Sequence, residues 1–296
     1  MRILIVGAGA TGGAFGTLLQ EAGRDVTYLL RPARAARLRR DGLRFISPEG
    51  DRTNQVQTLV AGEPAAPFDL VIVAVKAYAL DAALEDLRPY IGPKTLIMPI
   101  LNGMAQIDKI NAAFPGQLLG GIAKIVATLD GDAVHQMTPL CTLTIGDPNR
   151  GTVPAEVIDA LTVPGITMSV SGDILQGLWE KWAFIAAGGV ISCLFRAPIG
   201  RILDAGGHDQ IIASITELED VAAAAGHPVS EAAHGFSIGM LTEPGSIFTS
   251  SLYRDLIAGG PTESEHILGN FQAQARRLDR PTPMLDLTLI QIRAGQ

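Results

Sequence analysis

The chain has 296 residues, which is about two domains in length. Hydrophobic residues make up 47% of it, yet its longest apolar stretch, residues 182–195, is shorter than the roughly 20 residues that cross a bilayer. The net charge of −7 disfavours nucleic acid and anionic membranes as partners, and the short apolar opening, broken at Gly7, excludes a signal peptide. Two cysteines in apolar surroundings and five histidines without metal-ligand spacing indicate buried free thiols, a cytoplasmic location and no metal site.

A β-α-β unit is predicted at the start of the chain. The β-branched residues 1–6 predict a strand, residues 14–22 a helix and residues 26–30 a second strand. Between the first strand and the helix lies a glycine-rich loop, Gly7-Ala8-Gly9-Ala10-Thr11-Gly12. In this context the first glycine permits a tight turn, the second lets a pyrophosphate approach the backbone, and the third lets the helix pack closely. The unit therefore predicts a dinucleotide site rather than a purely structural turn.

Arg31 follows the second predicted strand, where NAD-binding chains place an Asp or Glu against the ribose 2′-hydroxyl. A guanidinium group can instead bind a 2′-phosphate through two charge-assisted hydrogen bonds. The residue therefore predicts NADP as the cofactor. Arg34 comes next, and Arg37, Arg39 and Arg40 are interpreted as a solvated helix face.

More strands are predicted further along the first half. Residues 43–46 and 56–60 are expected to form a hairpin around a turn at 48–51. Continuously apolar runs predict buried parallel strands at 69–75 and 95–101. The remaining runs are expected to continue the same sheet, at residues 118–127, 140–146 and 166–170.

Beyond residue 173 the apolar residues recur with the period of an α-helix. Helices are predicted over residues 174–195, 210–225, 230–241, 263–278 and 283–293. The chain is therefore predicted to be α/β, with a Rossmann-type dinucleotide-binding domain over residues 1–172 and an all-helical substrate and catalytic domain over residues 173–296. The surplus of apolar residues favours a subunit interface, and hence a homodimer.

Lys181 is the strongest candidate for a catalytic group. It lies between Trp179 and Trp182 in an apolar helix, an unusual place for an ammonium group. Reduction of a ketone by hydride transfer leaves an alkoxide, which needs a proton donor. Burial lowers the pKa of a lysine and a nearby carboxylate, such as that of Glu263, raises it again. The alternative is a lysine whose stem lies along the helix edge with its charge in water.

Other candidates each have a structural alternative. Asn102 follows a buried strand at the carboxyl edge of the sheet, where α/β proteins bind ligands, but Asn-Gly is also a common turn. Lys76 likewise ends a buried strand, or is a surface loop lysine. Ser251 and its neighbour Ser250 are ligand-binding hydroxyls or helix caps, and Glu263 lies at a segment that also fits a helix start.

These motifs, in this order, resemble the ketopantoate reductase (2-dehydropantoate 2-reductase) family over nearly the whole chain. The resemblance is carried by Gly7 to Gly12, Arg31, Val75-Lys76, Leu101 to Met104, Leu178 to Lys181, Ser250-Ser251 with Asp255, and Thr262-Glu263. It implies an NADP-dependent oxidoreductase that reduces 2-dehydropantoate to pantoate, in pantothenate biosynthesis, with a small 2-oxo acid as substrate.

The resemblance also implies roles for individual residues. Lys181 would be the general acid, with Glu263 reaching either that lysine or the nicotinamide ribose. Asn102, Lys181 and Ser251 would bind the substrate. The implied cofactor-binding residues are Gly7, Ala8, Gly9, Ala10, Thr11, Gly12, Arg31, Lys76, Asn102, Ala127 and Glu263.

Two positions depart from the family pattern. One and two turns beyond Lys181, where the family usually has Asn, the chain has Ile185 and Gly189. Loss of two amides removes hydrogen-bond partners for the carboxylate and hydroxyl of ketopantoate, so the substrate stays open. The alternatives are a bulkier or more apolar 2-oxo acid, an opine-type or imine-reducing dehydrogenase, and a catalytically idle NADP-binding sensor.

Overall fold

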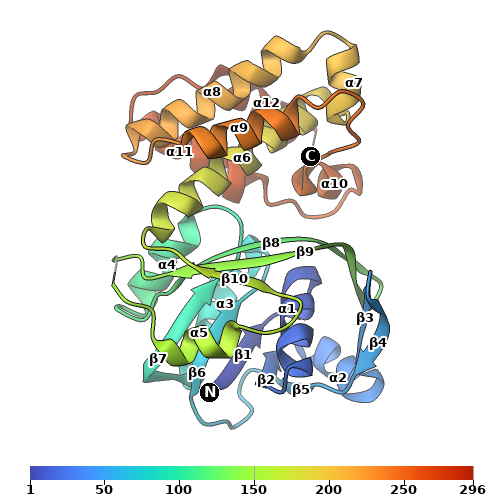
Figure 1. The fold of residues 1–296 in the computed structure, drawn as a ribbon, viewed down its shortest axis with the longest axis vertical. Coiled ribbons are helices and arrows are strands. Elements are labelled where there is room, and N and C mark those ends of the chain that lie inside the picture. The colour runs from blue at the N-terminus through green and yellow to red at the C-terminus, as the bar shows by residue number, and fades with distance from the viewer. Residues whose placement is uncertain (150, 296) are drawn as a thin grey trace. The chain divides into compact units, whose positions relative to one another are not determined.

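The computed structural model describes residues 1–149 and 151–295, which form two compact units. The first contains residues 1–101 and 106–175, and the second contains residues 102–105 and 176–296. The division into domains of residues 1–172 and 173–296 stays a proposal, and in the structure residues 102–105 group with the helical unit. The predicted class, an α/β domain followed by helices, is confirmed (Figure 1).

The first unit contains a five-stranded parallel sheet with the order β5-β2-β1-β6-β7. Its strands are β1 (Arg2–Val6), β2 (Asp25–Leu29), β5 (Gln57–Leu59), β6 (Phe68–Val73) and β7 (Ile91–Pro99). The helices that follow them in the chain are α1 (Ala10–Glu21), α2 (Pro32–Asp41), α3 (Leu80–Leu87) and α4 (Ala105–Ala113). The predicted β-α-β unit is therefore present, and its helix begins inside the glycine loop rather than at residue 14.

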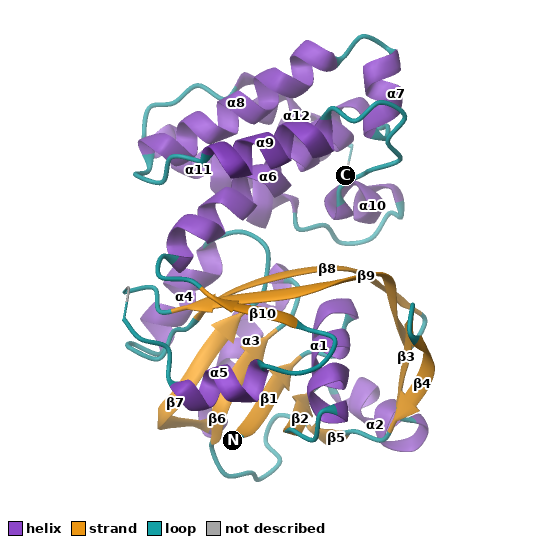
Figure 2. Cartoon of the chain, in the orientation of Figure 1, coloured by secondary structure: helices purple, strands orange, loops and turns teal. Residues whose placement is uncertain are grey.

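A second sheet in the same unit corrects the prediction of one continuous sheet (Figure 2). Its order is β10-β9-β3-β4, and β8 pairs with β9. The strands are β3 (Leu43–Ser47), β4 (Gly50–Asn54), β8 (Gly120–Asp130), β9 (Ala133–Gly146) and β10 (Thr167–Val170), with α5 (Ala155–Leu161) before the last. The pattern of apolar residues identifies a strand but not the strand with which it pairs. The strands after β7 could therefore not be assigned to a sheet from the sequence.

The predicted hairpin of residues 43–46 with 56–60 is also wrong. β3 pairs antiparallel with β4, while β5 pairs in parallel with β2 in the first sheet. The sequence of β4 is polar on both faces, so it carries no apolar alternation. Arg52 stabilises it instead, since its guanidinium binds Glu21 at 2.7 Å and lies over the ring of Phe45 at 4.7 Å.

Alternation along β1 divides the core of the first unit into two layers. Ile3 and Ile5 pack with α1 and the second sheet, whereas Leu4 and Val6 pack with α3 and α4 on the other face. All four are at least 97% buried, and each contributes about 1.5–3 kcal/mol by leaving water. As a result α1 is enclosed between the two sheets.

The second unit is helical, as predicted. Its elements are α6 (Ile174–Phe195), α7 (Ile199–Asp204), α8 (His208–Ala224), α9 (Glu231–Leu241), α10 (Ser251–Ile257), a π-helical turn (Glu265–Gly269), α11 (Asn270–Arg277) and α12 (Pro283–Ala294). The single helix predicted over residues 263–278 therefore begins with a π turn. The wider turn is stabilised by side chains, because Asn270 Nδ2 donates to the carbonyl of His266 at 2.9 Å and Trp182 Nε1 to that of Ile267 at 3.0 Å.

Helix α6 is the core helix of this unit, and from Trp182 onward its residues are almost all apolar. At 22 residues it is longer than the apolar stretch recognised in the sequence, and by length and composition alone it could cross a membrane. However, 67% of its most apolar window is buried inside the protein, and the core helix of a globular unit passes the same test.

The two cysteines confirm the expectation of buried free thiols. Cys141 lies in the first unit and Cys193 in α6 of the second. Burial raises the pKa of each thiol to about 12, so both stay protonated and unreactive at neutral pH.

Candidate functional site

The glycine loop of the first unit has the geometry that its three glycines predict. Gly7 has a φ of +97°, which makes the tight turn after β1. A Cβ on Gly12 would lie 2.2 Å from the carbonyl oxygen of Gly7 and 2.8 Å from Cβ of Ala74, so this glycine permits the close packing of α1. A Cβ on Gly9 would meet nothing within 4 Å, which leaves the space that a pyrophosphate needs.

The start of α1 adds hydrogen-bond donors to this loop. Gly9 is the N-cap of the helix and has no side chain to bind the first N–H groups, and the first turn carries no acidic residue. Unpaired N–H groups and the positive end of the helix dipole favour an anion at this point. The loop therefore fits the diphosphate of a dinucleotide.

Two arginines lie next to the loop in different environments. Arg31, at the N-cap of α2, has a side chain that is 65% exposed and binds Asp86 of α3 at 3.0 Å. Arg34 lies deeper, and its Nη2 donates to the carbonyl oxygen of Ala8 at 3.3 Å. From the sequence, only Arg31 was predicted to distinguish NADP from NAD. The contact of Arg34 with the loop depends on the fold, so the sequence did not reveal it.

Of the other cofactor candidates, Lys76 lies near the loop and Ala127 lies elsewhere. The carbonyl of Ala74, two residues before Lys76, lies 3.2 Å from where a Cβ of Gly7 would be, so this strand end adjoins the first glycine. Lys76 itself is exposed and precedes a short 3₁₀ helix. Ala127 lies in β8 next to an irregularity, opposite Gln136 of β9.

The remaining candidates, Asn102, Lys181, Ser251 and Glu263, all belong to the second unit. Lys181 is half-buried on α6, between the buried Trp179 and Trp182. The two tryptophan rings lie 5.1 Å apart. Since Trp182 donates to the carbonyl of Ile267, the register of α6 at Lys181 is fixed against the π turn. Glu263 lies two residues before that turn and is half-buried.

His266, in the π turn, is a residue of this site that the sequence did not predict. Its Nε2 lies 2.9 Å from the carbonyl oxygen of Asn102, so the ring donates to that turn. The adjacent Gly103 has a φ of +91°, and a Cβ there would lie 3.1 Å from the histidine ring. Asn102 therefore does form an Asn-Gly turn, and the turn is held against the segment that follows Glu263.

Ser250 and Ser251 have different positions. Ser250 is buried and caps α10, since its hydroxyl accepts from the N–H of Tyr253 at 3.1 Å and from the hydroxyl of Ser192 at 2.8 Å. The capping alternative is therefore correct for Ser250. Ser251 is the first residue of α10 and is exposed, which leaves its predicted role in substrate binding open.

The two positions that lack the family's asparagines lie in apolar surroundings. Ile185 is half-buried against the core of the second unit. A Cβ on Gly189 would lie 3.4 Å from Leu252 and 3.5 Å from Leu268, so a methyl group there would make ordinary contact, and a larger side chain would need these buried leucines to move. The face of α6 beyond Lys181 is therefore apolar because neighbouring leucines fill the space.

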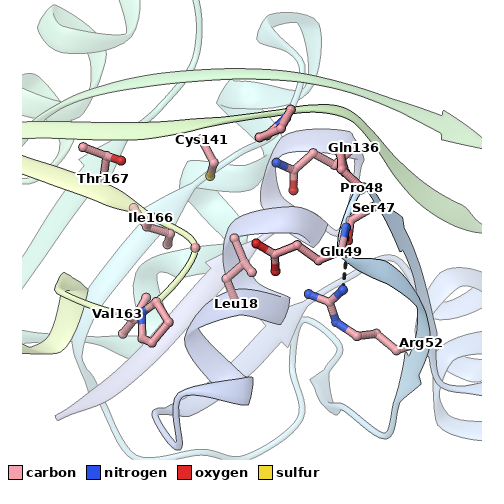
Figure 3. Close-up of a pocket in the computed structure, with 13 residues that line it drawn as sticks. Leu18, Ser47, Pro48, Glu49, Arg52, Gln136, Cys141, Val163, Ile166 and Thr167 are labelled. Carbon is pink, nitrogen blue, oxygen red and sulfur yellow. Dashed lines mark hydrogen bonds between the residues drawn. The ribbon is translucent and has the colours of Figure 1, made fainter.

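A cavity of about 530 Å³ in the first unit lies apart from these residues (Figure 3). It is lined by the β3–β4 turn, α1, β9 and the segment before β10, and includes Glu49, Arg52, Gln136 and Cys141. None of the predicted site residues lines it. Across residues 1–149 and 151–295, His, Cys, Asp and Glu do not gather in threes as a metal site requires.

Comparison with known proteins gives consistent matches. A family model described as ketopantoate reductase PanE/ApbA matches residues 3–150, and one described as ketopantoate reductase PanE/ApbA C terminal matches residues 173–296. The chain is 35% identical over 292 residues to an uncharacterized oxidoreductase, YkpB, of Bacillus subtilis (strain 168). That match covers 97% of this chain and 96% of the relative.

Solved structures share the fold over both units. The crystal structure of 2-dehydropantoate 2-reductase from Geobacter metallireducens GS-15 has a TM-score of 0.90 at 24% identity and covers 100% of both chains. A D-mandelate dehydrogenase in a ternary structure with NADH and anilino(oxo)acetate has a TM-score of 0.89 at 21% identity, with 99% of this chain and 98% of that chain covered. At these identities both structures establish the fold.

The loop geometry predicts different effects for two alanine substitutions. Gly12→Ala should lower the free energy of unfolding by about 1–3 kcal/mol, because the backbone oxygen of Gly7 cannot move aside for a methyl group. Gly9→Ala is the matched control, since it should unfold at the wild-type urea concentration but bind NADPH about tenfold or more weakly. Urea denaturation and NADPH titration measure the two effects. Equal destabilisation, or unchanged NADPH binding by Gly9→Ala, would contradict these roles.

Proposed function

The chain belongs to the ketopantoate reductase family, and we propose that within it the protein reduces a 2-oxo acid to the 2-hydroxy acid with NADPH. The observation that carries the proposal is Lys181, a half-buried lysine on the core helix α6, at a point where the hydrogen bond of Trp182 to Ile267 anchors that helix. A proton donor is what carbonyl reduction requires besides a hydride.

The first unit supplies the proposed cofactor site. The glycine loop and the N-terminus of α1 would bind the diphosphate, Arg31 the 2′-phosphate, and Lys76 would lie near the cofactor. The bound nicotinamide would supply the hydride. NADP rather than NAD is the finer part of this proposal, and it rests on Arg31, which stands after β2 where NAD-binding chains have an acidic residue.

The second unit supplies the proposed proton and substrate contacts. The ammonium group of Lys181 would donate a proton to the carbonyl oxygen as negative charge develops there. The amide of Asn102 would orient the substrate, because the hydrogen bond from His266 fixes the backbone of that residue. Glu263 would keep Lys181 in its charged form, and Ser251 would bind the substrate from the start of α10.

The resemblance makes ketopantoate the default substrate, and we propose that a 2-oxo acid with an apolar side chain fits this site better than ketopantoate, which carries a hydroxyl group. Ile185 supports this choice, because its half-buried side chain offers no hydrogen bond to a substrate hydroxyl. An apolar substrate chain would bury against it without leaving a polar group unpaired. A neighbour named D-mandelate dehydrogenase has the same fold, so the fold alone does not fix the substrate.

Assembly and location are further proposals. Leu287 and Ile290 on α12 are large apolar side chains that are more than half exposed, which supports a homodimer interface on that helix. Two buried thiols without a disulfide support a reducing, cytoplasmic location.

Replacement of the proposed acid tests the mechanism. Lys181→Ala should lower kcat by about 10²–10⁴-fold, the usual contribution of a positioned proton donor, while the Kd for NADPH stays near wild type. Lys181→Arg should stay slow, since a guanidinium holds its proton too tightly. Lys109→Ala is the matched control, because Lys109 is a surface lysine paired with Asp81 at 2.6 Å. If the wild type turned over and Lys181→Ala had the same kcat, a different residue would be the acid. If neither protein turned over while both bound NADPH, the idle sensor would be favoured.

Replacement of the apolar wall tests the substrate. Ile185→Asn adds a hydrogen-bond partner and should raise kcat/KM for ketopantoate relative to 4-methyl-2-oxopentanoate by about two- to tenfold, the value of one hydrogen bond. Ile185→Val is the control and should affect both substrates alike. Gly189 is left unchanged, since a larger side chain there would need Leu252 and Leu268 to move. A wild-type enzyme that is fast on ketopantoate and slowed by Ile185→Asn would contradict the proposal.

A further inference from the structure

Arg34 is more tightly placed than the other arginines of α2. Its side chain is 14% exposed, against 65% for Arg31. Its Nη2 donates to the carbonyl oxygen of Ala8, the second residue of the glycine loop, at 3.3 Å. The same nitrogen donates to the backbone oxygen of Asp132 at 3.0 Å, and Nη1 forms an ion pair with the Asp132 carboxylate. The guanidinium is therefore held between the loop and a second segment.

Asp132 comes from the turn between β8 and β9, in the second sheet of the same unit. Its carboxylate is shared, because Nε of Arg37 binds the other oxygen at 3.1 Å. Asp86 similarly neutralises Arg31 at 3.0 Å. The guanidinium groups of Arg31, Arg34 and Arg37 thus face two carboxylates, which leaves an excess of one positive charge.

This arrangement has a consequence for the cofactor's 2′ position. In a β-α-β unit the ribose 2′ group lies between the glycine loop and the residues that follow the second strand. Arg34 contacts the loop and lies three residues after Arg31, so its fork lies in that region. A phosphate monoester carries about 1.5–2 negative charges at neutral pH and binds an arginine fork in two places. A carboxylate on the same guanidinium occupies donors that the phosphate would use.

We propose that Arg34 is a cofactor-specificity residue that binds the 2′-phosphate alongside Arg31, and that Asp132 competes with this phosphate for the Arg34 guanidinium. The inference rests on the proposed use of a dinucleotide, and extends it to two residues that set the preference between NADPH and NADH. Asp132 thereby weakens the preference for NADPH that the arginines alone would give.

Binding of two nucleotides by calorimetry tests the inference without turnover. The probes are 2′,5′-ADP, which has the 2′-phosphate, and 5′-AMP, which lacks it. Arg34→Ala should weaken 2′,5′-ADP by about tenfold to a hundredfold and 5′-AMP by less than about threefold. Arg34→Lys keeps the charge but loses the fork, so it should also weaken 2′,5′-ADP selectively. Asp132→Asn should strengthen 2′,5′-ADP by about two- to fivefold, the range of an exposed ion pair.

Matched controls come from the same helix. Arg40 and Asp41 form an exposed pair on α2 at 2.6 Å, so Arg40→Ala and Asp41→Asn should leave the ratio of the two affinities unchanged. A ratio that stays at the wild-type value in both Arg34 variants would overturn the role of Arg34. Weaker binding of 2′,5′-ADP by Asp132→Asn would overturn the competition. If the wild-type protein bound neither nucleotide, the proposed cofactor itself would fail, which is distinct from an unchanged ratio.

Discussion

The close approach of α1 to its surroundings is the constraint on which the first unit depends. This helix begins in the glycine loop and passes between two sheets, and glycines occupy its closest contacts. At Gly16 a Cβ would lie 2.2 Å from the hydroxyl of Tyr28 and 2.5 Å from Ile5, and at Gly12 it would strike the loop itself. Packing of this density leaves no room for even one methylene group. The same approach directs the N–H groups of the first turn toward the loop, so that the packing of the fold and the anion-binding geometry have one cause.

In the second unit the corresponding element is α6, whose burial fixes a charged residue in an apolar setting. The indole N–H of Trp182 donates to the carbonyl of Ile267 in the π turn. That turn in turn presents His266 to the backbone of Asn102. Two hydrogen bonds to backbone carbonyls therefore connect α6, the π turn and Asn102, which are distant in sequence. Such π turns are often found at functional sites. The apolar face of α6 beyond Lys181 follows from the same packing, since Leu252 and Leu268 lie against Gly189.

Much of the fold was predictable because its signals are local. The central strands β1 and β6 are largely apolar runs, the glycine loop has its context on both sides, and α6 is mostly apolar. The second sheet was missed because strand period does not name a partner, and β4 because its residues are polar and stabilised by Arg52. His266 could not be found from sequence, since its partner Asn102 is 164 residues away. Arg34 differs from Arg37 only through contacts that the fold brings together.

The central claim, that this oxidoreductase reduces a 2-oxo acid with a nicotinamide hydride, is tested most directly by following the hydride. The wild-type protein would be incubated with NADPH carrying deuterium at the transferable position of nicotinamide C4 and with a panel of 2-oxo acids that includes ketopantoate and apolar analogues. Mass spectrometry would then locate the label. The account predicts a 2-hydroxy acid with one deuterium on carbon 2, formed in step with oxidation of the cofactor. Binding of NADPH without transfer of deuterium to any member of the panel would contradict it.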